Sequence, residues 1–162
     1  MTADAHAAVE RAKARSTAQL MMRCARLIDE VALGRLRAET GHNWRRAHTG
    51  LFPYIELDGS RVTEIARRAG VSKQAVAPLV AELVEWGVLE RVPDIRDGRA
   101  RLVRFAVDAD GTHAIVRGLA VLGTLESELE AVVGAERWTA LHTTLTELLP
   151  VVGAMRAAMP DR

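Results

Sequence analysis

The first quarter of the chain has the apolar spacing of a long amphipathic helix. Four apolar residues follow one another at steps of four, three and four: Leu20, Cys24, Leu27 and Val31. This spacing places them on one helical face and predicts a helix over residues 12–37, which the polar residues 40–43 end. A second, shorter helix is expected over residues 49–57, with Pro53 tolerated near its first turn.

The middle of the chain predicts two short helices joined by a tight turn. The first has four residues on its apolar face: Val62, Ile65, Ala66 and Ala69. Gly70 permits the left-handed conformation that ends it, and Ser72 can cap the next helix with its hydroxyl. The second apolar face contains Val76, Leu79, Val80, Leu83 and Trp86. This arrangement is a helix-turn-helix, with its second helix over residues 72–86.

A β-hairpin is predicted directly after these helices, over residues 88–105. Val88, Leu89 and Val92 form the first strand, and the returning strand contains Leu102, Val103 and Phe105. The polar residues 93–100 are expected to form the turn between the strands. The charged residues of this region are too many for a core and suit a groove lined by phosphates.

The last third of the chain predicts two more helices. One apolar stripe contains Ile115, Leu119, Leu122, Leu125, Leu129 and Val132. After Gly134, a second stripe contains Trp138, Leu141, Leu145, Leu148, Val152, Met155 and Met159. Together with the N-terminal helix, these stripes present more apolar surface than a small hairpin-bearing unit covers alone. We therefore expect the helices to form a two-fold dimer.

Composition supports a folded, mainly helical protein. Apolar residues make up 49% and charged residues 27% of the 162 residues, which excludes a disordered chain. Only 4% of the residues are aromatic, and the abundance of Ala, Leu, Arg and Glu favours helices. The net charge of +1 is unevenly distributed, because residues 61–107 are rich in basic groups and residues 108–162 in acidic ones. Such a chain can present one face to a polyanion.

The remaining composition indicates the compartment. The single cysteine, Cys24, excludes an internal disulfide and agrees with a reducing cytosol. Residues 1–18 lack the apolar core of a signal peptide, and no window approaches about 18 uninterrupted apolar residues. We expect a soluble, cytoplasmic protein that has no membrane partner.

Three segments of the middle region resemble the multiple-antibiotic-resistance regulator (MarR) family. They are the opening GVSKQAV of the second helix, its exit EWGVLERVPD, and the hairpin segment DGRARLV. The resemblance implies a winged helix-turn-helix over residues 44–107, with recognition helix 72–86 and wing 88–105. It also implies a helical dimerisation region formed by residues 12–40 and 108–160. The expected fold class is mainly α with a small β-hairpin.

Two positions depart from the pattern of the family. The wing of such proteins often reads Asp-Arg-Arg, whereas here Gly98 stands between Asp97 and Arg99. Pro78 lies inside the predicted recognition helix, where proline normally costs about 3 kcal/mol. In having a proline at this place, the chain resembles some members of the organic-peroxide-sensing branch of the family. The prediction of a recognition helix therefore stands.

The start of the recognition helix is the expected reading site. In such proteins its first turn reaches the edges of the bases in the major groove, and the positions concerned are Ser72, Lys73, Gln74 and Ala77. Gln74 can pair with adenine, and Lys73 can reach a guanine edge or a phosphate. Alternatively, Lys73 and Gln74 are a solvated helix face, and Ser72 is only a cap.

The wing supplies further candidates for DNA binding. Arg99, expected at the hairpin tip, suits insertion into a narrow minor groove, with Asp97 as its orienting partner. Arg96 and Arg101 are expected to contact phosphates, and their alternative role is a generic charged turn. Thr63 is expected to cap the first helix and to donate to a phosphate; the alternative is that it is only a cap.

The resemblance also implies a small aromatic or phenolic effector. Trp44, Arg45 and His48 lie near the expected junction of the two regions and can stack on or pair with such an anion; the alternative is packing for Trp44 and a solvated surface for the cations. Peroxide-sensing relatives carry a cysteine in the first helix, which makes Cys24 a candidate redox sensor. Its place on the apolar stripe, with only Tyr54 available to orient it, favours a buried, inert thiol.

The predicted function is transcriptional regulation. We expect a homodimer, and a repressor, that binds a palindromic operator in double-stranded DNA and is released by its effector. The alternatives are a winged-helix protein-interaction module without DNA binding and a redox-sensing regulator that uses Cys24. Phosphate loops, paired carboxylates, zinc spacings and nucleophile elbows are missing from the sequence. We therefore expect neither an enzyme nor a bound metal or cofactor.

Overall fold

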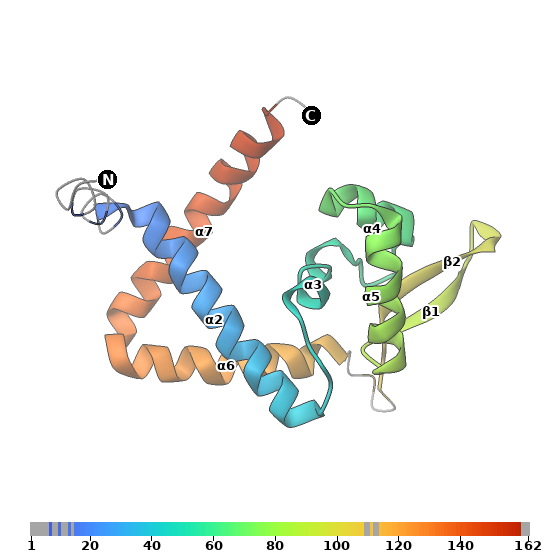
Figure 1. Ribbon diagram of the computed structural model, residues 1–162, viewed down its shortest axis with the longest axis horizontal. Coiled ribbons are helices and arrows are strands. Elements are labelled where there is room, and N and C mark those ends of the chain that lie inside the picture. Colours follow the sequence, from blue (N-terminus) through green and yellow to red (C-terminus); the bar gives the residue numbers. More distant parts are fainter. Residues whose placement is uncertain are drawn as a thin grey trace. The chain divides into compact units, whose positions relative to one another are not determined.

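The protein is mainly helical and has one small hairpin, which confirms the predicted fold class (Figure 1). The computed structural model describes residues 15–108, 111 and 114–159, together with residues 7, 10 and 13. The elements are α2 (Thr17–Thr40), α3 (Arg46–Thr49), η1 (Phe52–Tyr54), α4 (Val62–Ala69), α5 (Lys73–Glu85), β1 (Leu89–Asp94), β2 (Asp97–Phe105), α6 (Ala114–Val133) and α7 (Ala135–Ala157). The chain divides into two compact units, Met1–Val121 and Leu122–Arg162.

Capping residues determine the ends of α2. The Ser16 hydroxyl accepts a backbone N–H of the first turn at 3.3 Å. Gly41 ends the helix with a left-handed φ of 72° and donates its N–H to the carbonyl four residues earlier at 2.9 Å. The helix ends later than the predicted range of residues 12–37, because its cap rather than the apolar stripe decides where it stops. At the start of that range residues 13 and 15 are also helical, and residues 12 and 14 lie outside the described residues.

The apolar stripe of α2 is largely uncovered. Leu20 is 58% exposed, Leu27 49% and Val31 45%. Cys24 is a free, exposed thiol on the same helix. The prediction of a buried thiol is therefore wrong for the single chain, because the described residues leave the stripe to which Cys24 belongs exposed.

The segment between α2 and α4 corrects another prediction. In place of one helix over residues 49–57, the short helix α3 ends at Thr49 and the single 3₁₀ turn η1 follows. Pro53 has no backbone N–H to donate one turn back, so it is tolerated only at the start of a helix. After η1, Ile55 is extended and buried, and the backbone runs on toward the hairpin.

Helices α4 and α5 form the predicted helix-turn-helix. They pack against each other, and Gly70 joins them with a left-handed φ of 71°. Ser72 caps α5, since its Oγ accepts the N–H of Ala75 at 3.2 Å. Pro78 lies inside α5, which nevertheless continues to Glu85.

The hairpin is longer and tighter than its predicted form. Strands β1 and β2 pair in antiparallel register from Leu89 with Phe105 to Pro93 with Arg101, and Asp94 then pairs with Asp97 across a bulge that contains residues 98–100 of β2. Only Ile95 and Arg96 remain in the turn, so the prediction of a turn over residues 93–100 is wrong. Residues 98–100 form a bulge in β2, and a composition rich in charge and glycine does not distinguish a bulged strand from a loop.

A third segment extends the hairpin by one bridge. The Ser60 N–H donates to the Val103 carbonyl at 2.8 Å, and the Val103 N–H donates back at 2.9 Å. The bridge follows a turn at Gly59, where φ is 110°. The chain entering α4 is thereby attached to the strand that leads out of the wing.

One hydrophobic core supports these elements. Its members are Leu33, Trp44, Leu51, Ile55, Ile65, Ala66, Val76, Val80, Leu83, Leu89, Val103 and Phe105. They come from α2, the α3 region, both helices of the helix-turn-helix and the hairpin. Burial of each large apolar side chain contributes about 1.5–3 kcal/mol, so α5 and the hairpin share one rigid support.

The second unit has little core of its own. Gly134, with a φ of 90°, separates α6 from α7, and α7 has no buried residue. Its exposed large apolar residues are Leu141, Leu145, Leu148, Leu149, Val151, Val152 and Met155. Within the described part of the chain, no helix has the length and apolarity that crossing a bilayer requires.

Candidate nucleic-acid interface and pocket

The first turn of α5 presents polar side chains to solvent. Ser72, Lys73 and Gln74 are exposed, and Ala77 is half-buried. The next helical turn enters the core, since Val76 is fully buried. The start of α5 is therefore available to a partner while its apolar face holds the helix in place.

Thr63 does not cap α4. Arg61 occupies the N-cap position of this helix, and no side chain makes the capping hydrogen bond. Thr63 is the second residue of α4 and is exposed. The capping prediction is wrong because α4 begins at Val62, one residue before Thr63.

The wing presents a row of cations. Arg96 lies in the two-residue turn, and Arg99 and Arg101 lie on β2, and all three are exposed. Arg99 lies in the bulged part of β2 next to the tip, between the pairs Asp94–Asp97 and Pro93–Arg101. Ile95 stands at the tip with its side chain fully exposed.

Arg61, Asp94 and Asp97 form a cluster, here called the wing clamp. Arg61 donates to Asp94 Oδ2 from Nε at 3.0 Å and from Nη2 at 2.6 Å. Its Nη2 also reaches Asp97 Oδ2 at 3.3 Å. The hydrogen bond from Arg61, with a further one from the Arg96 N–H, lowers the pKa of Asp94. The clamp holds the wing against the start of α4.

The wing clamp changes the role of Asp97. Its Oδ1 accepts the backbone N–H of Arg99 at 3.3 Å, and its Oδ2 accepts from Arg61. Asp97 therefore binds the backbone of Arg99 and the side chain of Arg61, and not the Arg99 guanidinium as predicted. The sequence analysis missed Arg61 and Asp94. An Asp before a two-residue turn is a signal for the Asp94 bond to the Arg96 N–H, but no sequence signal points to Arg61.

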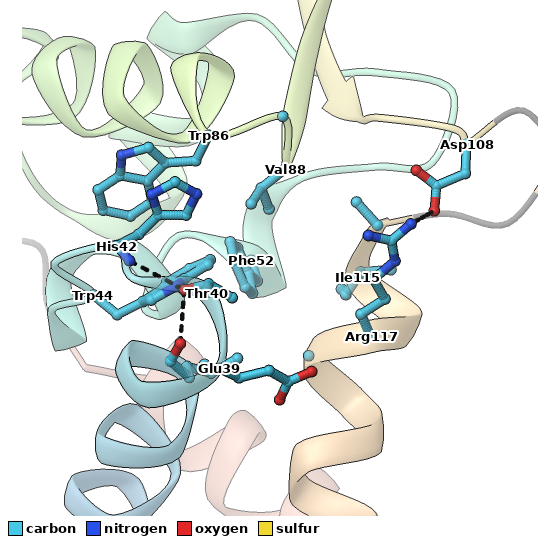
Figure 2. Close-up of a pocket in the computed structure, with 14 residues that line it drawn as sticks. Glu39, Thr40, His42, Trp44, Phe52, Trp86, Val88, Asp108, Ile115 and Arg117 are labelled. Carbon is cyan, nitrogen blue, oxygen red and sulfur yellow. Dashed lines mark hydrogen bonds and ion pairs between the residues drawn. The ribbon is translucent and has the colours of Figure 1, made fainter.

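A pocket of about 360 Å³, here called the junction pocket, lies between the end of α2, the end of α5 and the start of α6. It is lined by Leu36, Glu39, Thr40, His42, Trp44, Phe52, Trp86, Gly87, Val88, Asp108, Ala114, Ile115, Arg117 and Gly118. Figure 2 shows aromatic side chains on one side and the Asp108–Arg117 pair on the other. Its volume is in the range of small-molecule sites.

The aromatic side of the junction pocket is tightly packed. The His42 and Trp86 rings stack with centroids 5.0 Å apart and planes 4° apart. The ring centroid of Trp44 lies 5.1 Å from that of Trp86 and 6.2 Å from that of Phe52, which it meets edge-on. The Trp44 indole N–H donates to Thr40 Oγ at 3.0 Å. Trp86 is also the C-cap of α5, so the aromatic side of the pocket is attached directly to the end of α5.

Of the three residues predicted to bind an effector, only Trp44 lines the junction pocket. His48 is fully buried, and Arg45 forms an ion pair with Glu82 of α5 at 2.7 Å. The sequence analysis did not predict Trp86 and Arg117 as pocket residues, because only the fold brings the end of α5 close to the start of α6.

His48 and Arg45 instead attach α3 to α5. His48 Nδ1 accepts the Arg45 N–H at 3.0 Å, so its Nε2 carries the proton and donates to Glu82 at 3.2 Å. Burial lowers the pKa of His48 below its ordinary value of 6.5, and the charge of Arg45 lowers it further, while Glu82 opposes both effects. The side chains of Arg45, His48 and Glu82 thus hold α5 to α3 and to the neighbouring Trp44.

Residues 54–100 match the model of the MarR family. No curated protein matches this chain significantly. The matching segment contains both helices of the helix-turn-helix and most of the wing. The resemblance to the MarR family is confirmed.

Solved structures extend the MarR-family likeness in fold to most of the chain. MepR, a transcription regulator of the Staphylococcus aureus multidrug efflux pump MepA, is 15% identical, with 85% of this chain and 98% of that chain covered and a TM-score of 0.60. Wild-type MarR from E. coli is 20% identical, with 83% and 98% covered and a TM-score of 0.62. CouR from Rhodococcus jostii RHA1, solved with p-coumaroyl-CoA, is 16% identical, with 93% and 98% covered and a TM-score of 0.61.

Proposed function

We propose that this protein is a homodimeric transcriptional regulator, and a repressor, that binds a palindromic operator in double-stranded DNA. The observation that carries the proposal is that one core supports both the exposed, polar start of α5 and the hairpin with its exposed arginines. The MarR-family match over the same residues supports it. A cytoplasmic location follows from the proposed DNA target.

The chemistry of the exposed residues supports distinct roles. Lys73 and Gln74, at the start of α5, suit base edges in the major groove, and Ser72 suits a phosphate while it caps the helix. The arginines at positions 96, 99 and 101 suit phosphates and the minor groove, where the negative potential is deepest. Thr63, exposed in the first turn of α4, is a further phosphate contact in this proposal.

The exposed apolar faces of α2, α6 and α7 support the dimer. Monomeric soluble proteins rarely leave contiguous apolar patches of this kind uncovered, and a two-fold dimer is the commonest arrangement that covers them. A dimer of winged helices places its two recognition helices roughly 34–36 Å apart, which is one turn of DNA. The operator would then be a palindrome with half-sites at that spacing.

The junction pocket supports regulation by a small aromatic or phenolic effector. Its aromatic wall suits a flat ring, and CouR, a protein of the same fold, was solved with p-coumaroyl-CoA. A ligand changes operator affinity only if it binds the DNA-competent and released conformations differently. The contact of Trp86 with both the pocket and the end of α5 provides a route for that difference.

The test is a DNA titration of the full chain. Fluorescence anisotropy is measured with the duplex upstream of the protein's own gene and with a scrambled duplex of the same length. We expect tight, salt-dependent binding to the first and markedly weaker binding to the second. A dimer that binds no duplex at low ionic strength would favour the winged-helix protein-interaction module instead.

A further inference from the structure

We propose that Pro78 is a specificity-determining residue of this protein, and that it contacts the 5-methyl group of a thymine in the major groove. The inference rests on the proposed DNA-binding function and names the chemical group that one position of α5 recognises. Pro78 lies inside α5, five residues after its first residue Lys73, and is exposed.

Pro78 weakens the helix that carries it. Proline has no N–H, so the Gln74 carbonyl, four residues earlier, receives no helical hydrogen bond from this position, and the ring crowds that carbonyl. The hydrophobic core formed by the described residues does not include Pro78. Pro78 therefore costs helix stability and adds no packing to this core. A residue that breaks a local rule of folding without a structural gain is characteristic of a functional site.

Pro78 stands at the centre of the solvent-facing side of α5. Three residues on the opposite side of the helix are fully buried: Val76, Val80 and Leu83. Gln74 lies one turn before Pro78 on the same exposed face, so a groove that receives the Gln74 side chain also receives Pro78. Ala75 and Ala81, each three residues from Pro78, are exposed and short. They leave the proline ring free to approach a base pair.

The acidic residues near Pro78 limit the contact to the first two turns of α5. Glu82, four residues after Pro78, is held by Arg45, whose Nη2 donates to the two carboxylate oxygens at 2.7 and 2.8 Å. Its charge is thereby compensated within the chain. Glu85 is exposed at the end of α5, two turns after Pro78, where a carboxylate repels the phosphates of DNA. The start of the helix is therefore the part that suits the groove.

Thymine is the base that a proline ring can distinguish. In the major groove the C5 methyl of thymine is an apolar group, whereas the base edges otherwise present hydrogen-bond donors and acceptors. The pyrrolidine ring has neither a donor nor an acceptor, so it cannot pair with those edges. It can bury a methyl group, and removal of apolar surface from water is favourable. The ring is also rigid, so the contact costs almost no side-chain entropy.

Uracil interference locates the contact, since uracil differs from thymine only by the missing methyl group. The duplex upstream of the protein's own gene is prepared with deoxyuridine at a small random fraction of its thymidine positions and is bound to the full chain. Bound and free duplexes are separated by electrophoresis and cleaved at uracil. We expect uracil at one thymine position of each half-site to be depleted from the duplex that the wild type binds.

Two substitutions test whether Pro78 makes the contact. A duplex with uracil at that position of each half-site is compared with the parent duplex by fluorescence anisotropy, and the ratio of the two Kd values is taken for each protein. The wild type should lose about two- to fourfold in affinity for each methyl group removed. Pro78→Ala keeps a smaller apolar side chain and should show a smaller ratio. Pro78→Ser has a polar hydroxyl and should bring the ratio close to unity.

Both substitutions restore the helical N–H, so neither removes support from the fold. Ile95→Ala is the matched control, because it also shortens an exposed apolar side chain but lies at the tip of the wing. The wing is proposed to contact the minor groove, whereas the thymine methyl lies in the major groove. This variant should therefore keep the ratio of the wild type, whatever its absolute affinity. Each ratio is taken within one protein, so changes in helix stability or dimerisation cancel.

Three outcomes would overturn the proposal and leave the proposed DNA binding intact. They are a wild type that binds the duplex without a uracil-sensitive thymine, a Pro78→Ser variant that keeps the full ratio, and an Ile95→Ala variant whose ratio falls as far as that of Pro78→Ser. A wild type that binds no duplex at low ionic strength would remove the proposed function and this inference together.

Discussion

The side chain of Arg61 positions the wing relative to α4. It joins the start of α4 to Asp94, 33 positions later in the chain, and Asp94 is 8% exposed at its side chain. A carboxylate in that position requires a partner, and Arg61 supplies two donors. The position of the wing relative to α4 therefore depends on an ion pair between residues that are far apart in sequence.

Substitution of Arg99 tests whether the wing contacts DNA. Arg99→Ala removes one exposed cation from β2, and each phosphate contact contributes to the release of counterions on binding. We expect weaker operator binding and a salt-dependence slope reduced by about 1, measured by anisotropy over several salt concentrations.

The control for this prediction is Arg137→Ala, which removes an exposed cation from α7. It should leave the slope unchanged. Equal slopes for wild type and Arg99→Ala would remove Arg99 from the DNA contact.

His48 carries a prediction about pH. The unfolded chain takes up a proton at this position below about pH 6.5, whereas the buried His48 takes it up only at lower pH because burial lowers its pKa. The folded state therefore binds fewer protons in this window, and its stability falls as the pH falls. We expect the unfolding free energy in urea to drop between pH 7 and pH 5, and to drop less in His48→Gln.

His142→Gln is the matched variant for this measurement, because His142 is exposed on α7. It should retain the pH dependence of the wild type. If His48→Gln retained it as well, the titration of His48 would not contribute to stability.

At the scale of elements, the hairpin and α4 depend on the turn at Gly59. Its φ of 110° is a conformation that L residues rarely adopt, and an added Cβ would lie 2.9 Å from Leu102 Cβ. The turn delivers Ser60 to its bridge with Val103. The wing is thus attached to the helix-turn-helix at its base by this bridge and at its tip by the wing clamp.

Gly59→Ala should therefore destabilise the fold. The strained backbone alone costs about 1–3 kcal/mol, and Leu102 must shift as well. Thermal unfolding followed by circular dichroism should show a lower Tm. Gly98→Ala on the wing is the control, since an added Cβ there meets nothing within 4 Å. A Tm lowered equally by both substitutions would contradict this account.

At the scale of the whole molecule, α7 is the helix that buries least, since none of its residues is buried by the described part of the chain. Every residue of α7 is at least partly exposed, including Leu145 at 44% and Val152 at 57%. A helix with so much apolar surface needs a second surface to pack against. The proposed dimer provides one, and it also determines the separation of the two reading helices.

Leu145→Asp tests this arrangement. A charge in an apolar interface leaves a carboxylate without a partner, so we expect sedimentation velocity to show a shift from dimer to monomer. Thr143→Asp introduces the same charge two positions earlier, on the opposite side of the helix, and should remain dimeric. A dimer that persists in Leu145→Asp at low concentration would place the interface elsewhere.

The sequence by itself determined the local structure: the helix-turn-helix around Gly70 and Ser72, the existence of the hairpin, and the exposed cations of the wing. These features follow from periodicity, capping and turn chemistry, which act between near neighbours. Only the tertiary structure decided that Arg61 holds Asp94, that His48 and Arg45 bind Glu82, and that Trp86 and Arg117 share a pocket. Such contacts join residues far apart in the chain, and their partners depend on how the elements pack.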